Sequence, residues 1–175
     1  MDIAWTSWRS PLGLLTLVEG ETGPLVIDLA AHAAQGGWRE RLSARHPTLR
    51  VRMGRCHVTR EWLEAYFAGH QPAAPDTGHL AEAWGATAPQ LEVWRAIGEI
   101  PFGEVRAYDD LAASTGIHPR QVGQAAGANP LLLLIPCHRV VGKQGDLGGY
   151  AGGLAAKQWL LDHELRSAGL VLRGG

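Results

Sequence analysis

The chain is organised around Asn129-Pro130-Leu131-Leu132-Leu133-Leu134-Ile135-Pro136-Cys137-His138-Arg139-Val140-Val141. The apolar run Leu131–Ile135 is too short to cross a membrane, so we predict a buried strand or a buried extended segment. Pro136 has no N–H and interrupts regular structure, which leaves Cys137 at an irregular point beside the core. A cysteine needed only for packing would fit better inside the run. We therefore predict that Cys137 is a nucleophile.

Length and charge describe an ordinary soluble globular protein. The 175 residues allow one or two small domains, and the formal net charge of −1 gives no general support for nucleic-acid binding. Any basic surface must therefore be local. The segment Met1–Trp5 lacks the basic start and apolar core of a signal peptide, and no window is apolar enough for a transmembrane helix. We expect a cytoplasmic protein without membrane contact.

The two cysteines, Cys56 and Cys137, suit a reducing compartment. One disulfide between them is formally possible, but intracellular chains rarely keep such bonds. Cys56-His57 has no partner at zinc-ligand spacing in the sequence. We predict no structural metal.

The first half of the chain predicts a small α/β domain. Short apolar segments with intervening turn residues predict strands at 5–8, 12–18 and 25–29, the first two as a hairpin. Helical spacing of apolar residues predicts helices at 38–44 and 58–67. Gln71–Gly85 is rich in Pro, Ala, Gly and Asp and predicts a linker. We find no chemistry in this half and interpret its tryptophans as core residues. The predicted domains are 1–84, including the linker, and 85–175.

The second half predicts mostly helices. A first helix spans about Pro89 to Ile97, and a short helix over Tyr108–Thr115 ends at Gly116. Pro119 is then well placed in the first turn of another helix. A helix, a glycine turn and a second helix form the helix-turn-helix pattern.

The second helix of this pair, Arg120–Ala128, contains two glycines and three alanines. This composition gives a poor helix former with a thin cross-section. One interpretation is close packing of the helix against a neighbour. The other is a helix slim enough for a narrow groove, as minor-groove binding and base extrusion require. Composition alone favours neither.

Pro136-Cys137-His138-Arg139-Val140 resembles the active-site motif of the O6-alkylguanine-DNA alkyltransferases, which move an alkyl group from a damaged base onto their own cysteine. The resemblance extends from about Pro89 to Glu164. It implies a small N-terminal α/β domain and a mostly helical C-terminal domain with a winged-helix-like helix-turn-helix. It also implies a monomer without a cofactor, which binds duplex DNA in the minor groove.

The resemblance extends to the glycine-rich helix and favours the groove interpretation. Arg120-Gln121-Val122-Gly123 is similar to the recognition helix of the family, whose arginine enters the duplex in place of the flipped nucleotide. We expect Gln121, Gly123 and Ala126 to face DNA. The turn before Arg120 is shorter than usual, which leaves the docking angle of the helix open.

Cys137 needs activation, because a free thiol has a pKa near ~8.5 and only the thiolate attacks well. His138 is the nearest base. Adjacent residues of an extended chain point apart, so we expect a bridging water between the two side chains. The resemblance supplies an acceptor for the histidine, Glu164, from a helix over Leu154–Arg166. Sequence alone would make Glu164 a solvated charge.

The resemblance assigns further roles around the base. Asn129 joins the helix-turn-helix to the cysteine segment, although it could be only a turn residue. Tyr108 hydrogen-bonds the guanine as it leaves, and its alternative is a core aromatic. The loop Gly148–Gly153 covers the alkyl group. Within it we expect Tyr150, Ala151 and Gly152 to contact substrate, with Ala151 where many members have serine. Lys143 is a candidate phosphate contact, or an ordinary surface lysine.

These expectations describe a repair protein that alkylates itself once, irreversibly, on Cys137, with O6-alkylguanine and possibly O4-alkylthymine as the damaged base. Two alternatives come from other classes. A non-catalytic DNA-binding relative would lack the cysteine. A cysteine hydrolase would turn over and would not need a glycine-rich DNA helix.

Overall fold

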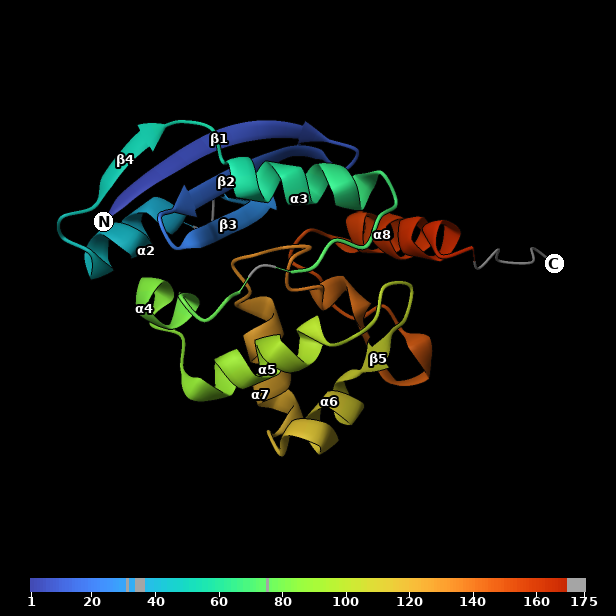
Figure 1. The fold of residues 1–175 in the computed structure, drawn as a ribbon. Coiled ribbons are helices and arrows are strands. Elements are labelled where there is room, and N and C mark those ends of the chain that lie inside the picture. Colours follow the sequence, from blue (N-terminus) through green and yellow to red (C-terminus); the bar gives the residue numbers. More distant parts are fainter. Residues whose placement is uncertain (31, 34–36, 75, 170–175) are drawn as a thin grey trace.

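A four-stranded sheet forms the first half of the protein (Figure 1). The computed structural model describes residues 1–30, 32–33, 37–74 and 76–169. The strands lie in the order β3-β2-β1-β4, with bounds β1 (Asp2–Ser10), β2 (Gly13–Gly20), β3 (Gly23–Leu29) and β4 (Arg50–Met53). β1 and β2 pair antiparallel with Trp5 opposite Val18, so the predicted hairpin and third strand are confirmed. β4, which pairs parallel with β1, was not predicted because only four residues form it.

Helices α2 (Trp38–Arg45) and α3 (His57–Phe67) accompany the sheet, close to their predicted ranges. α3 lies along the sheet (Figure 1) and buries Trp62, Leu63 and Tyr66. Their spacing places them on one helical face.

The prediction of a linker over Gln71–Gly85 is wrong for the last part of this segment. Its last part forms α4 (Leu80–Trp84), in which Leu80 has no exposed surface. The indole N–H of Trp84 donates to the carbonyl of Leu25 at 2.9 Å. These apolar residues anchor the segment to the sheet, because burial stabilises them despite a turn-rich composition.

The second half is mostly helical, as predicted. It contains α5 (Ala88–Gly98), α6 (Tyr108–Thr115), α7 (Pro119–Gly127) and α8 (Leu154–Ser167), with the two-residue parallel strands β5 (Arg106–Ala107) and β6 (Val140–Val141). α6 ends at Gly116, whose φ of 70° lies in the left-handed region that favours glycine. Pro119 occupies the first turn of α7. The chain therefore has the helix, glycine turn and helix that the sequence predicts.

The cysteine segment, 129–141, lies against the sheet. Ile27 of β3 makes two backbone hydrogen bonds to the start of this segment, both at 2.9 Å. The Ile27 N–H donates to the carbonyl of Pro130, and the Leu132 N–H donates to the carbonyl of Ile27. Residues 131–141 are buried, which confirms that part of the prediction. A regular strand does not form, because Leu133 has a φ of 76° and turns the chain.

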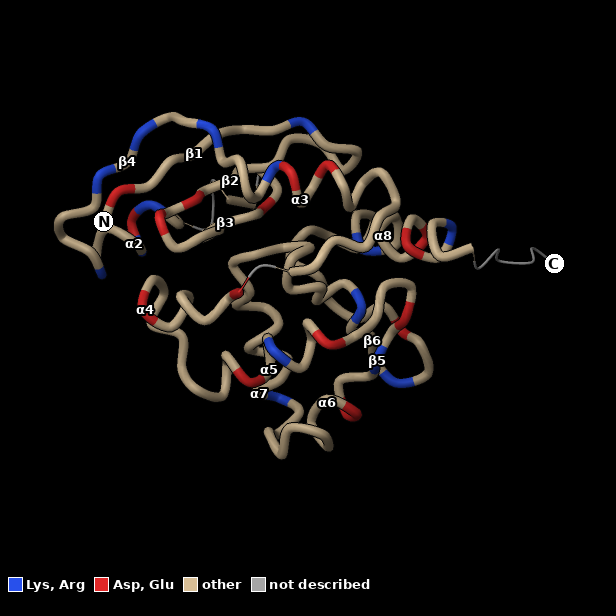
Figure 2. The backbone as a smooth tube through the Cα atoms, viewed as in Figure 1, with Lys and Arg blue, Asp and Glu red and all other residues tan. Residues whose placement is uncertain are grey.

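One hydrophobic core extends through both halves. It joins Leu17 and Ile27 of the sheet to Ile97, Leu132 and Leu160. Basic and acidic residues are dispersed over both halves (Figure 2). Every helix among the described residues is too short or too polar to traverse a bilayer. The boundary near residue 84 stays a prediction.

Candidate active site

Cys137 begins a single 3₁₀ turn, Cys137–Arg139, directly after Pro136. The side chain is 5% exposed and is a free thiol, as is that of Cys56. Burial raises the pKa of Cys137 to about 11, although a hydrogen bond from Asn129 and the charge of Lys157 act in the opposite direction. At neutral pH the resting side chain is a thiol, and its reaction requires that a base take the proton.

Asn129 connects the end of α7 to the cysteine segment. Its Oδ1 accepts from the Leu131 N–H at 2.8 Å. Its Nδ2 donates to the Ile135 carbonyl at 2.8 Å and to Cys137 Sγ at 3.2 Å. A single amide thus fixes both the backbone of the segment and the sulfur.

His138 and Glu164 form a buried pair. His138 Nε2 lies 2.7 Å from Glu164 Oε1, and neither side chain is exposed. An ionised carboxylate only accepts hydrogen bonds, so Nε2 carries the proton and Nδ1 of the neutral ring has a lone pair. Nδ1 is buried and has no hydrogen-bond partner among the described residues. Burial lowers the pKa of His138, against the opposing effect of Glu164.

Glu164 remains charged because several donors surround it. Arg139 Nε lies 2.9 Å and the Gly103 N–H 3.0 Å from Oε2. Burial alone would raise the pKa of Glu164, but the hydrogen bonds from His138 and Arg139 and the charge of Arg139 outweigh burial and lower it to about 2. The sequence-only interpretation of Glu164 as a solvated charge is therefore wrong.

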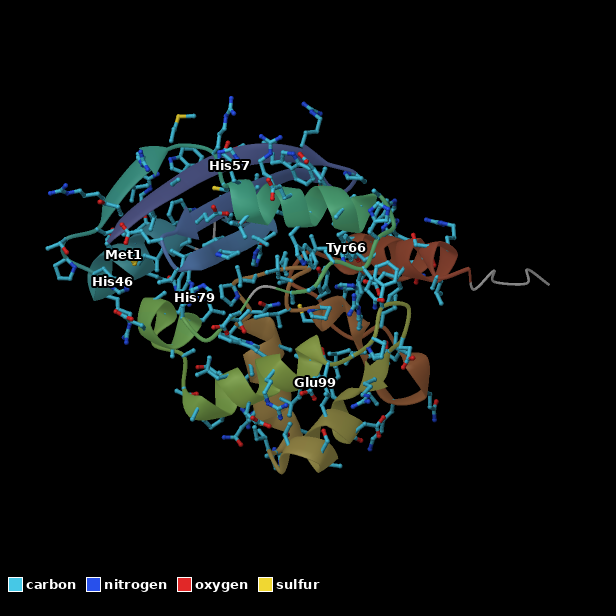
Figure 3. All side chains as sticks on the ribbon, in the orientation of Figure 1. Met1, His46, His57, Tyr66, His79 and Glu99 are labelled. Carbon is cyan, nitrogen blue, oxygen red and sulfur yellow. The ribbon has the colours of Figure 1, made fainter. Side chains whose placement is uncertain are left out.

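Two members of this network were not predicted as site residues. The Tyr66 hydroxyl donates to Glu164 Oε1 at 2.7 Å, and Arg139 donates to both carboxylate oxygens. Tyr66 belongs to α3 and lies where α3 approaches α8 (Figure 3). The first half thus contributes to the network, where the sequence indicated no chemistry. No signal in the sequence links Tyr66 to Glu164, since the two are far apart along the chain.

Lys157 is a third residue that the sequence did not identify. It is completely buried, and its Nζ donates to the Val140 carbonyl at 2.6 Å and also to the Leu147 carbonyl. Because its charge favours the thiolate of Cys137, it adds a positive field behind the sulfur. A lysine within an amphipathic helix normally indicates a solvated position.

Cys137 opens onto a cavity of about 500 Å³. The described residues that line it are His32, Tyr108, Gly123, Ala126, Gly127, Cys137, Gly149, Tyr150 and Ala151. The structure therefore brings most predicted substrate contacts to one cavity. Gly152 is not among them, but a Cβ there would lie 2.7 Å from the Tyr150 ring. The absence of a side chain at Gly152 therefore leaves room for the Tyr150 ring at the cavity.

The glycines of α7 face open space. A Cβ added at Gly123 or Gly127 would meet nothing within 4 Å, whereas Val122, Ala125 and Ala126 form the buried face. The helix does pack closely through its alanines, but the two glycines take no part in that packing. They leave a thin, open side of α7 beside the cavity.

Three predicted DNA contacts lie outside the cavity lining. Arg120 and Gln121 are exposed in the first turn of α7, whose N-terminus is capped by His118. Lys143 pairs with Asp109 at 2.8 Å, and both are exposed. Such exposed pairs contribute little stability. Among the described residues, no group of three or more His, Cys, Asp or Glu could hold a metal ion.

Comparisons with known proteins agree with this geometry. Residues 88–166 match the family model for the DNA-binding domain of 6-O-methylguanine DNA methyltransferase. A methylated-DNA–protein-cysteine methyltransferase from Mycolicibacterium paratuberculosis is 37% identical over 169 residues, covering 94% of this chain and 93% of the relative. The crystal structure of Mycobacterium tuberculosis OGT in complex with DNA matches with a TM-score of 0.73 and 30% identity, over 95% of this chain and 94% of that one.

The relative from Salmonella typhimurium has a higher identity over a shorter region. It is 51% identical over 105 residues, which are 58% of this chain. In this alignment, and in those with the Salmonella typhi and Shigella flexneri proteins, the chain spans 59% of the relative.

Proposed function

Because the chain belongs to the methylated-DNA–protein-cysteine methyltransferase family, we propose that it repairs DNA by moving the alkyl group of O6-alkylguanine onto Cys137. The observation that carries the proposal is the cavity in which Cys137 meets Tyr108, Tyr150 and the open side of α7. O4-alkylthymine is a second candidate base.

The first step is removal of the thiol proton. His138 Nδ1 is the base, and a bridging water carries the proton to it, since Nδ1 has no hydrogen-bond partner among the described residues. Glu164 accepts from Nε2 and stabilises the imidazolium that forms. Lys157 and Asn129 favour the thiolate.

The second step is displacement at the alkyl carbon. The sulfur forms a C–S bond as the C–O6 bond breaks, and the electron pair of that bond goes to the guanine. Tyr108, which lines the cavity, is positioned to hydrogen-bond the departing base and offset its developing charge. The thioether is not hydrolysed under cellular conditions, so each molecule acts once and needs no cofactor.

The target base must first leave the duplex. We propose that α7 lies in the minor groove, where the open side at Gly123 allows close approach of the DNA backbone. Arg120 then fills the space left by the flipped nucleotide, with Gln121 beside it. All these residues come from one chain, so the proposed form is a monomer. A free Cys137 thiol persists in a reducing compartment such as the cytoplasm, the location we propose.

Intact-mass measurement tests the function. Incubation of the protein with duplex DNA containing O6-methylguanine is expected to add one methyl, and only one, to the peptide that contains Cys137. Cys137→Ser should accept none, and Cys56→Ser should react as the wild type does. Catalytic turnover would indicate a hydrolase instead, and DNA binding without modification would indicate a non-catalytic relative.

A further inference from the structure

We propose that His32, held by Asp28, binds the phosphate group of the nucleotide that enters the Cys137 cavity. The proposal rests on the function proposed above and gives the first half of the chain a direct part in binding DNA. Neither residue carries any signal in the sequence, which indicated no chemistry in this half.

The position of His32 is the first observation. Among the described residues that line the cavity, His32 alone precedes Tyr108 in the chain. It also lines a smaller adjoining cavity of about 80 Å³, together with Arg41 and with Gly127 of α7. The His32 side chain is 46% exposed. It therefore lies at the rim of the site rather than at its floor.

The pairing of His32 is the second observation. His32 Nδ1 lies 2.6 Å from Asp28 Oδ2, and the Asp28 side chain is only 16% exposed. The other carboxylate oxygen, Oδ1, is buried and has no hydrogen-bond partner among the described residues. A carboxylate in this environment is costly unless a cation or a donor faces it. His32 supplies that partner, and the pair directs Nε2 of the ring away from Asp28.

The third observation is that the pair has a fixed place relative to the nucleophile. Asp28 belongs to β3, and its neighbour Ile27 makes two backbone hydrogen bonds to the cysteine segment. The same sheet that supports Cys137 thus supports Asp28. Ion pairs between residues i and i+4 of a fully solvated helix have no such constraint, and they contribute little to stability.

Phosphate is the ligand that this arrangement suits. A nucleotide that leaves the duplex brings its own phosphates to the mouth of the pocket. Half or more of protein–DNA hydrogen bonds go to phosphate and sugar, and these fix the position of the protein on the strand. Because Nδ1 of His32 faces Asp28, Nε2 is the ring nitrogen left to contact a phosphate, and an imidazolium donates from both nitrogens. Arg41, stacked on Trp84 at 4.7 Å, adds positive charge beside the adjoining cavity.

His32→Ala tests the proposal against two substrates, a duplex with O6-methylguanine and free O6-benzylguanine, which has no phosphate. Loss of one charge-assisted hydrogen bond should slow the duplex reaction below saturation by roughly tenfold. The free-base reaction should not change. The dependence of duplex binding on salt should also become less steep by up to about one unit of log–log slope.

His57→Ala is the matched control. His57 is an exposed histidine at the start of α3 and lies beside the sheet (Figure 3). Both rates should stay at the wild-type value. If His32→Ala does not fold, His32→Gln keeps a donor for Asp28 without the charge and decides the same comparison.

Asp28→Asn tests the positioning residue. Asp28 also raises the pKa of Cys137, so Asp28→Asn changes the reactivity of the thiol with both substrates. The effect on phosphate binding is therefore measured as the ratio of the duplex rate to the free-base rate. That ratio should fall in the same direction as for His32→Ala. A purely structural role would lower both rates together.

If His32→Ala lowers the rate equally on both substrates, His32 shapes the pocket and the proposal is overturned. If neither rate falls, His32 has no role in the reaction and the proposal is overturned as well. An unchanged salt dependence with a lower duplex rate also overturns it. Failure of the wild type to accept any alkyl group would instead reject the proposed function itself.

Discussion

His138 Nε2 donates to Glu164 Oε1 across 2.7 Å, and both side chains are completely buried. This contact fixes the proton on Nε2 and leaves Nδ1 as the base. The pair is supported by Tyr66 from the sheet half and by Arg139 from the same turn as the nucleophile. The site therefore depends on contacts between both halves of the protein.

Tyr66→Phe should separate stability from reactivity. The change removes a hydroxyl that donates to a charged, buried carboxylate, which should cost about 1.5–3 kcal/mol of unfolding free energy. The His138–Glu164 contact remains, so the rate with free O6-benzylguanine should fall less than about tenfold. His138→Gln is the comparison, because it keeps an amide donor for Glu164 but loses the base, and its rate should fall roughly 10²–10⁴-fold. Urea unfolding and single-turnover kinetics measure the two effects. Equal rate loss in both variants would place Tyr66 in the chemistry itself.

The stability of the folded protein should decrease as the pH falls below about 6.5. Burial lowers the pKa of His138 from its usual 6.5 in the folded protein. As the pH falls, His138 is therefore protonated first in the unfolded chain, and this protonation stabilises the unfolded state relative to the folded state. Glu164 has a folded pKa of about 2 against an ordinary 4.5, so a second loss should begin near pH 4.5 and continue toward pH 2. Urea midpoints between pH 8 and pH 3 measure both. In His138→Gln the first decrease should be smaller, and the second should shrink but persist because Arg139 still lowers the pKa of Glu164. A flat profile from pH 8 to pH 5 would show that His138 does not titrate with folding.

Gly123→Ala should have opposite effects on stability and on DNA repair. A Cβ at this position meets nothing within 4 Å, so the better helix propensity of alanine should stabilise α7 by up to about 1 kcal/mol. The added methyl projects into the open space beside α7 and keeps the DNA backbone farther from the helix. The duplex reaction should therefore slow, while the free-base reaction is retained. Gly98→Ala is a matched control, because Gly98 also has open space and lies in α5 outside the cavity lining. An unchanged duplex rate in Gly123→Ala would mean that DNA does not approach this side of α7.

Arg120→Ala should slow repair in duplex DNA far more than reaction with free O6-benzylguanine. Extrusion of a base costs a few kcal/mol, and a side chain that fills the gap offsets part of this cost. Arg120 is exposed at the first turn of α7 and touches none of the buried network, so stability should not change. Rates on the two substrates and a thermal melt decide the outcome. Equal losses would make Arg120 a structural residue.

The sequence predicted most helices and strands because their apolar periodicity is local. It failed where tertiary contacts decide the structure. Leu80 and Trp84 form a helix in a turn-rich segment because the sheet binds them. Leu133 adopts a left-handed conformation inside an apolar run, which the apolar pattern alone does not predict.

The candidate site could be predicted only as far as its motif extends. Cys137, His138 and Asn129 are close in sequence, and Glu164 came from the resemblance. Tyr66 and His32 come from the first half, where no motif exists, and only the fold brings them to the cavity network. Periodicity could assign Tyr66 to a buried helical face, but not to the carboxylate it contacts.

The alkylated protein should be less stable than the free protein. Cys137 is 5% exposed, and its sulfur lies 3.2 Å from Asn129 Nδ2. A methyl on the sulfur crowds a packed site and disturbs the hydrogen bond that Asn129 Nδ2 donates to Sγ, so we expect a loss of about 1–3 kcal/mol. Because Asn129 follows α7 and also bonds Leu131 and Ile135, the disturbance should reach that helix and weaken DNA binding.

Thermal melts before and after reaction with free O6-methylguanine measure this loss without DNA. Cys137→Ser, treated in the same way, controls for effects of the free base and should melt at one temperature throughout. The cavity of about 500 Å³ beside the sulfur offers the competing outcome. If the methyl enters that space and the melting temperature stays the same or rises, the packing cost is absent and Asn129 keeps its other two hydrogen bonds. Release of repaired DNA would then have to follow from loss of the base from the cavity, and not from strain transmitted through Asn129 to α7.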